Sequence, residues 1–166
     1  AVDAGADLAT VTGPHVLRGV EIYRGKPLFY GLGSFFLQLA DDRGPSADTA
    51  RALGVDPLAL TKPEAIARQF QLPADWYDSV VATSHFHAGR LSEVRLHPLV
   101  LNREPAPRLE GAPRPAPPAD AHRILEQLRQ DCLQWGTTLA IENGVGVIRV
   151  GDRPGRPGSP DAATGT

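Results

Sequence analysis

Hydrophobic and polar positions at both ends of the chain alternate in short runs, a pattern typical of paired β-strands. Residues 20–23 and 27–30 are rich in β-branched and aromatic side chains, and a short Arg-Gly-Lys segment separates them. Residues 137–142 and 145–150 flank an Asn-Gly pair, in which both residues tolerate a positive φ. The pattern therefore predicts two β-hairpins.

A long amphipathic helix is predicted between these hairpins, over residues 120–135. Gly136 follows it and is suited to the left-handed conformation that ends many helices. Apolar residues recur at steps of three and four, as the buried face of a helix requires. They are Ala121, Ile124, Leu125, Leu128, Cys132 and Trp135.

The middle of the chain combines helical and extended patterns. Residues 41–47 are predicted to form a loop, and residues 46–72 short helices that prolines divide. Strands are expected at 79–83 and 90–101, with Ala88-Gly89 as the turn between them. Pro98 cannot donate a ladder hydrogen bond, so the end of the second strand is predicted to be an edge or a bulge.

Proline and glycine mark the remaining segments. Six of the sixteen prolines fall within residues 103–118, which predicts a crossing segment with little capacity for a sheet ladder. Residues 151–166 contain few apolar side chains and are predicted to be a disordered tail. Residues 1–150 then form one unit, in agreement with the usual domain size of about 100–150 residues.

Composition excludes several classes of protein. The formal net charge is −2 and charged residues make up 22% of the chain, so no global basic field exists to hold a nucleic acid. No apolar run approaches the ~18 residues of a membrane span. The single cysteine, Cys132, cannot form an internal disulfide and lies on the apolar helix face. Neither its presence nor the composition indicates a cellular compartment.

His15 is the first candidate for chemistry. It follows Gly13 in a loop after a small-residue strand expected at 6–11. A loop at a strand end can present a metal ligand, because the strand fixes the loop and the glycine allows close approach. The alternative is that His15 is structural or simply exposed.

The other histidines have alternatives of the same kind. His85 and His87 flank Phe86 and would share one face of an extended strand, where two imidazoles could hold one ion. The alternative is a polar strand edge. His97 and His122 are most simply solvated.

Several motifs in the first part of the chain form a connected pattern with regular spacing. They are Asp3-Ala4-Gly5-Ala6-Asp7, Gly13-Pro14-His15-Val16-Leu17-Arg18-Gly19, Glu21-Ile22-Tyr23, Gly25-Lys26-Pro27 and Tyr30-Gly31-Leu32-Gly33-Ser34-Phe35. This pattern resembles the CapA family of poly-γ-glutamate capsule synthesis proteins. The C-terminal part is similar to the family's closing helix and hairpin, at Gly111-Ala112-Pro113, Gly136-Thr137 and Ile141-Glu142-Asn143-Gly144.

The resemblance implies a fold and a metal chemistry. The fold would be an α/β class, the C-terminal portion of a metallophosphoesterase-like α-β-β-α sandwich with a mixed sheet, a closing helix and a β-hairpin. Residues 1–150 would pack against the protein's own N-terminal part, which would carry the family's other metal motifs. Two divalent ions (Mn, Zn or Fe) would activate water. His15 would be a metal ligand, and Arg18 and Ser34 possible contacts to an anionic substrate or polymer.

Two departures from the family pattern keep alternatives open. Where the family has Gly-His, this chain has Val11-Thr12, and a threonine hydroxyl is a much poorer transition-metal ligand than imidazole. Ser34 stands where the family has asparagine. One hypothesis is a metal-dependent hydrolase, of which these 166 residues alone would be inactive. A second is a non-catalytic assembly component of a polymer-export system. A third is a small α/β protein whose histidines are all structural.

Overall fold

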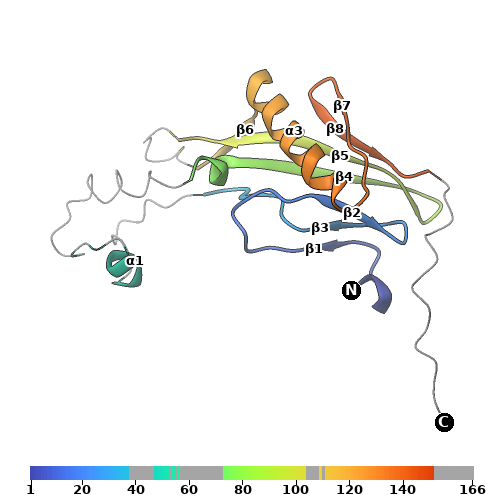
Figure 1. Ribbon diagram of the computed structural model, residues 1–166, viewed down its shortest axis with the longest axis horizontal. Helices are drawn as coiled ribbons and strands as arrows, with labels where there is room; N and C mark the ends of the chain where they lie inside the picture. The colour runs from blue at the N-terminus through green and yellow to red at the C-terminus, as the bar shows by residue number, and fades with distance from the viewer. Residues whose placement is uncertain are drawn as a thin grey trace, which may run out of the picture.

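The computed structural model describes residues 1–37, 47–52, 54, 56, 73–103, 109 and 111–151. These residues form two sheets and a long helix, α3, that contacts β2 of one sheet and β5 of the other (Figure 1). The predicted α/β class is confirmed. The predicted loop at 41–47, most of the segment at 46–72 and the tail beyond Gly151 lie outside the described residues, apart from α1 (Ala47–Ala52).

The smaller sheet contains the first predicted hairpin. Its strands are β1 (Ala9–Thr10), β2 (Val20–Tyr23) and β3 (Lys26–Phe29), in the order β1-β3-β2. β3 pairs antiparallel with β2 and parallel with β1. Arg24 and Gly25 have φ values of 50° and 75°, the left-handed pair that a tight hairpin needs. The prediction is confirmed, although β1 is much shorter than the strand expected at 6–11.

The larger sheet has five strands, and its four-strand path runs β4-β5-β8-β7. The predicted Ala88-Gly89 turn joins the first two, and the predicted Asn143-Gly144 turn joins the last two; all four residues have positive φ. β4 is longer than predicted because its second half pairs with β5 as far as His87. The strands are β4 (Asp78–His87), β5 (Arg90–Leu101), β6 (Pro113–Pro115), β7 (Ala140–Glu142) and β8 (Val145–Arg149).

Pro98 lies in a central strand, so its predicted place at an edge or bulge is wrong. β5 pairs with β4 from Arg90 to Val100, with a bulge at Ser92, and Pro98 lies opposite Val80. The Ala116 N–H donates to the Pro98 carbonyl at 3.1 Å, so the backbone polar positions of Pro98 face away from β4. On that side, pairing with β8 ends at Leu96 and pairing with β6 begins at Leu99. The missing N–H of Pro98 therefore falls in a gap between partners.

The proline-rich crossing also forms a ladder, contrary to the prediction. β6 pairs antiparallel with β5, with Arg114 opposite Val100. The Ala112 carbonyl accepts from Asn102, and the Ala116 N–H donates to Pro98. Residues of even number therefore face β5, because successive residues of a strand alternate in direction. The prolines occupy the odd positions, where a missing donor faces away from the sheet.

The predicted helix is observed as α3 (Pro118–Leu133), preceded by Pro117. Gly136 has a φ of 67°; its N–H donates to Leu133, and the next N–H, of Thr137, donates to Cys132. These two hydrogen bonds are those of a Schellman motif, which confirms the predicted stop at Gly136. Trp135 lies beyond the helix and is 43% exposed, so its predicted place on the buried face is wrong.

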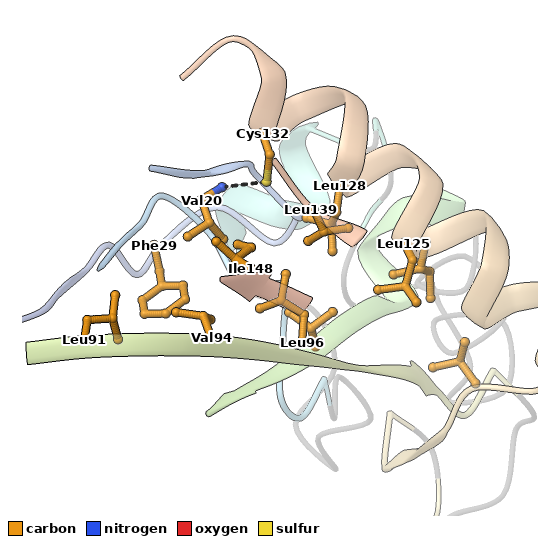
Figure 2. Packing of buried hydrophobic residues seen from close by; sticks show 13 residues of the cluster. Val20, Phe29, Leu91, Val94, Leu96, Leu125, Leu128, Cys132, Leu139 and Ile148 are labelled. Carbon is orange, nitrogen blue, oxygen red and sulfur yellow. Dashed lines mark hydrogen bonds between the residues drawn. The ribbon is translucent and has the colours of Figure 1, made fainter. Parts of the chain in front are cut away.

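One hydrophobic core joins both sheets and the helix. Cys132 is fully buried, as predicted, and its Sγ accepts a hydrogen bond from the backbone N–H of Val20 at 3.3 Å (Figure 2). Burial raises the pKa of the Cys132 thiol, which keeps it neutral. The other buried members are Phe29, Val80, Leu91, Val94, Leu96, Val100, Ile124, Leu125, Leu128, Leu139 and Ile148. The small sheet is thus fixed to α3 by packing and by a polar contact.

No helix in the described part of the chain is long and apolar enough to cross a membrane.

Candidate metal-ligand loop

The loop carrying His15 and the segment carrying Ser34 lie side by side. The first connects β1 to β2, and the second follows β3. Leu17 forms an antiparallel bridge with Leu32, and the Arg18 N–H donates to the Gly31 carbonyl at 3.0 Å. A side chain on Gly31 would crowd the carbonyl oxygen of Val16 at 2.8 Å, so glycine permits this close approach. The pairing continues the geometry of the small sheet into the loop region.

A third segment, at the start of β4, closes this frame. Gly33 forms an antiparallel bridge with Ser79, and the Val80 N–H donates to the Leu32 carbonyl at 3.1 Å. The same carbonyl accepts from Ser79 Oγ at 3.1 Å. The start of β4, and η2 (Ala74–Tyr77) before it, are therefore held next to the segment that carries Ser34.

The His15 imidazole contacts both neighbouring segments. Its Nδ1 lies 2.9 Å from Ser34 Oγ, and its ring stacks on the Trp76 ring with centroids 4.5 Å apart. His15 is otherwise exposed. Because Ser34 occupies Nδ1, Nε2 is the nitrogen through which this side chain can bind a ligand. Histidines that bind metals commonly hold their second ring nitrogen in such a hydrogen bond.

The other predicted site residues lie in the same region with different surroundings. Ser34 is half-buried, and its hydroxyl contacts His15. Ser34 can therefore position His15, a role separate from the contact with substrate that the resemblance implies. Arg18 is exposed, and its Cγ lies close to Gly31. Thr12 and Val11 are exposed. Within the described ranges no three His, Cys, Asp or Glu side chains are grouped so that they could hold a metal ion.

Trp76 is the contact residue that sequence reasoning missed. Its only local signal is its place before Tyr77 at the start of a strand. Asp78, two residues on, is 8% exposed and accepts two hydrogen bonds from Arg123 of α3, at 2.6 and 2.8 Å. This carboxylate raises the pKa of Arg123 above its already high ordinary value. The ion pair joins the segment carrying Trp76 to the long helix.

Tyr30 anchors the end of β3 where the Gly31–Ser34 segment begins. Its hydroxyl donates to Glu21 Oε2 at 2.6 Å, and its ring stacks on Trp135 at 4.8 Å. The hydrogen bond to the Glu21 carboxylate, together with burial and the charge of Glu21, raises the pKa of Tyr30 to about 12. The phenol therefore stays neutral well above its ordinary range.

We expect Tyr30→Phe to remove a pH-dependent part of stability. An unfolded tyrosine ionises near pH 10, whereas folded Tyr30 keeps its proton to about pH 12. Between these values the unfolded state binds fewer protons, so the wild type loses this stabilisation as pH rises. Two pKa units correspond to at most about 2.7 kcal/mol, and partial exposure reduces this to about 1 kcal/mol. Urea unfolding of both proteins at pH 8–12 measures the difference between their free energies of unfolding. A difference that stays constant across that range would contradict the prediction.

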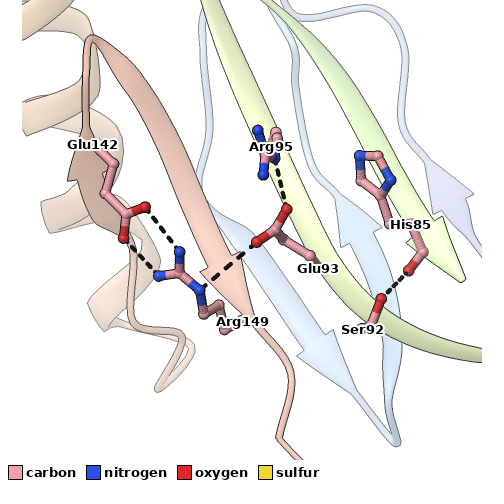
Figure 3. A network of polar contacts seen from close by, with 6 residues as sticks. All are labelled: His85, Ser92, Glu93, Arg95, Glu142 and Arg149. Atoms are coloured by element: carbon pink, nitrogen blue, oxygen red, sulfur yellow. Dashed lines mark hydrogen bonds and ion pairs between the residues drawn. The ribbon is translucent and has the colours of Figure 1, made fainter. Parts of the chain in front are cut away.

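His85 and His87 lie at the exposed end of the β4–β5 hairpin. His85 pairs with Glu93 across the strands, and Ser92 Oγ donates to the His85 carbonyl at 3.0 Å (Figure 3). Glu93 is already paired with Arg95 at 2.6 Å and with Arg149 at 3.7 Å, and hydrogen bonding to Arg95 lowers its pKa. The carboxylate across from His85 is therefore engaged in an ion-pair network, which favours the polar-edge interpretation.

His97 is half-buried on β5, whereas His122 is exposed in the first turn of α3. The solvated state predicted for both fits His122 fully and His97 in part.

The described residues define a mixed α/β protein whose N-terminal hairpin region carries the candidate loop. The family model described as "Bacterial capsule synthesis protein PGA_cap" matches residues 1–38, which include His15, Arg18 and Ser34. The chain is also similar to two proteins of Sinorhizobium fredii (strain NBRC 101917 / NGR234), "Uncharacterized protein y4sH" and "Uncharacterized protein y4uA". Each is 37% identical over 163 residues, which cover 90% of this chain and 35% of the relative. The chain thus spans about a third of the length of these curated relatives.

Proposed function

We propose that this chain is part of a CapA-like protein of capsule or poly-γ-glutamate synthesis, and that the whole protein is a metal-dependent phosphoesterase-type hydrolase. The observation that carries the proposal is the contact between His15 Nδ1 and Ser34 Oγ, which leaves Nε2 for a ligand. The capsule-synthesis family model supports it, because its match covers both of these residues.

The remaining metal ligands would come from the protein's own N-terminal part. Two observations support this partner. Among the described residues His15 has no second and third ligating side chain beside it, and the similar relatives are much longer than this chain. β1 is also an edge strand beside the exposed side chains of Leu8 and Val11, and an edge of this kind can pair with a further strand. The ions would be Mn, Zn or Fe: imidazole suits Zn and Fe, whereas Mn would depend on carboxylate ligands from the N-terminal part.

The ions would supply a metal-bound water and charge stabilisation at a phosphoryl group. The residues of this chain would contribute one ligand, held in place by Ser34, and Arg18 would offer a cation to an anionic substrate or polymer.

A second candidate function is a non-catalytic binding or assembly component of a polymer-export system. Thr12 favours it, because a threonine hydroxyl replaces an imidazole of the family motif. Such a protein would keep the fold and the anionic partner while the metal site is incomplete.

Metal binding and hydrolysis by the full-length protein test both candidates. We expect about two ions per chain by elemental analysis, and hydrolysis of bis(p-nitrophenyl) phosphate. His15→Ala should weaken metal binding by more than about 100-fold, since losing a partner of a ligand alone costs about 10–100-fold. His122→Ala is the control, because His122 is exposed on α3.

The outcomes separate the candidates. Equal metal binding by the His15→Ala and wild-type proteins would contradict the role of His15. A wild type without bound metal or activity, together with a Thr12→His variant that gains both, would support the non-catalytic component. Binding of poly-γ-glutamate by that metal-free wild type would support it further.

A further inference from the structure

The indole of Trp76 is a fixed surface against the His15 ring. The two rings are inclined by 29° with centroids 4.5 Å apart, within the range of offset aromatic stacking. Trp76 is half-buried and packs against a small cluster of Leu37, Tyr77 and Leu101. Its backbone N–H donates to the Pro73 carbonyl at 3.1 Å. Trp76 is therefore held by contacts other than the one with His15.

The two partners of His15 belong to one frame. Ser34 follows Gly33, which is bridged to Ser79, and Trp76 precedes Asp78, which is paired with Arg123. A Cβ on Gly33 would overlap the carbonyl oxygen of Asp78, so the two segments are in direct backbone contact. The separation between the Ser34 hydroxyl and the Trp76 ring is consequently set by the fold and not by His15.

The two contacts restrain different motions of the imidazole. The hydrogen bond to Ser34 holds the Nδ1 atom in place, whereas stacking on Trp76 restrains the tilt of the ring. His15 is exposed and lies in a loop, and rotation about χ2 of histidine is broad and roughly two-fold. With Ser34 alone, the ring retains one flexible contact and can turn so that either nitrogen faces the solvent.

We propose that Trp76 is a positioning residue for His15. Together with Ser34 it fixes the orientation of the imidazole, with Ser34 Oγ accepting a hydrogen bond from protonated Nδ1 and with Nε2 presented to the ligand. The effect of Trp76 on metal affinity rests on the proposed function, whereas its effect on the ring itself does not.

The first test reads the tautomer directly. Full-length protein labelled with ¹⁵N-histidine is studied by long-range ¹H–¹⁵N NMR at a pH where the ring is neutral, and His15→Gln assigns the signals. We expect one Nδ1-protonated species in the wild type and a mixture of tautomers in Trp76→Leu. Trp76→Phe keeps a stacking ring and should restore the single species.

Matched controls separate stacking from general damage. Trp135→Leu removes the other tryptophan, which stacks on Tyr30, and should leave the His15 signals unchanged. Leucine at position 76 keeps an apolar contact with Leu37 and Tyr77, so the fold should persist, and circular dichroism confirms it. If Trp76→Leu does not fold, Trp76→Phe and Trp76→Met decide between stacking and apolar volume. A tautomer mixture in the wild type, or no change in the non-aromatic variant, overturns the proposal.

The second test measures Mn²⁺ affinity by calorimetry. We expect about 5–10-fold weaker binding in Trp76→Leu, within the usual effect of residues that orient a ligand, and binding within about two-fold of wild type in Trp76→Phe. A wild type that binds no Mn²⁺ defeats the proposed function, while the tautomer result still decides the role of Trp76. Normal metal affinity in a folded Trp76→Leu protein defeats the positioning role alone.

Discussion

Replacing Leu125 with alanine is expected to lower the free energy of unfolding by about 3–4 kcal/mol, within the range for deletion of a large core side chain. Leu125 is fully buried on α3. Its Cδ2 packs directly over Gly146 of β8, 2.9 Å from where a Cβ would be. Because glycine has no side chain, Gly146 cannot fill the cavity that Leu125→Ala leaves. Since helix and strand are both held by the surrounding core, the cavity should collapse only partly.

Leu133→Ala is the matched control for this prediction. It makes the same chemical change on the same helix, but Leu133 is 57% exposed, so the loss should stay within about 0.5 kcal/mol. Urea unfolding of the full-length variants, followed by far-UV circular dichroism, gives both values. Similar losses in the two proteins would mean that α3 does not pack on the sheet through Leu125.

Local signals in the sequence were sufficient for the hairpins and the helix. Gly25, Asn143 and Gly144 have the positive φ values that glycine and asparagine tolerate, and Arg24 adopts one beside Gly25. Turn geometry depends on adjacent residues, so it can be predicted from them. The helix stop at Gly136 is likewise a local backbone event. Each prediction needed only the residues inside the element, and the hairpins and the helix are confirmed, apart from the place of Trp135.

The errors concern the neighbours of a strand. Pro98 is compatible with a central strand because its missing donor faces the gap between β6 and β8, and both of these strands come later in the chain. A sequence pattern shows that a proline lacks an N–H, but it does not show which side of the strand that position faces. The same reason explains the unexpected ladder of β6.

The residues of the candidate site also divide into those with a local sequence signal and those brought in by a distant segment. His15 and Ser34 belong to motifs of fixed spacing, so both were predicted to take part in the site, although not to contact each other. Trp76 comes from a distant segment, and it meets His15 because the start of β4 is bridged and hydrogen-bonded to Leu32 and Gly33. No pattern around Trp76 encodes that bridge. Residues that position a ligand from another segment are therefore found only in the folded chain.

Gly33→Ala tests the bridge on which this arrangement depends, and it should lower the free energy of unfolding by about 3 kcal/mol. Gly33 has a φ of 75°, and a methyl group there would overlap the backbone carbonyl of Asp78. The Asp78 backbone cannot move aside easily, because Asp78 is paired with Val100 in the sheet and Arg123 holds its carboxylate through two hydrogen bonds. Ser34 would shift with its neighbour, so the contact with His15 should weaken as well.

Gly144→Ala distinguishes this overlap from the strain of a positive φ. Gly144 has a nearly equal φ of 77° but nothing within 4 Å of an added Cβ, so only the backbone term remains, about 1–2 kcal/mol. Urea unfolding gives the two losses, and ¹⁵N-histidine NMR of Gly33→Ala and Gly144→Ala reports the His15 ring in each. If both variants lose equal stability and keep the His15 signals of the wild type, the approach of Gly33 to Asp78 does not hold the site together. A larger loss in Gly33→Ala, with a disturbed His15 ring only in that variant, is the result that the bridge requires.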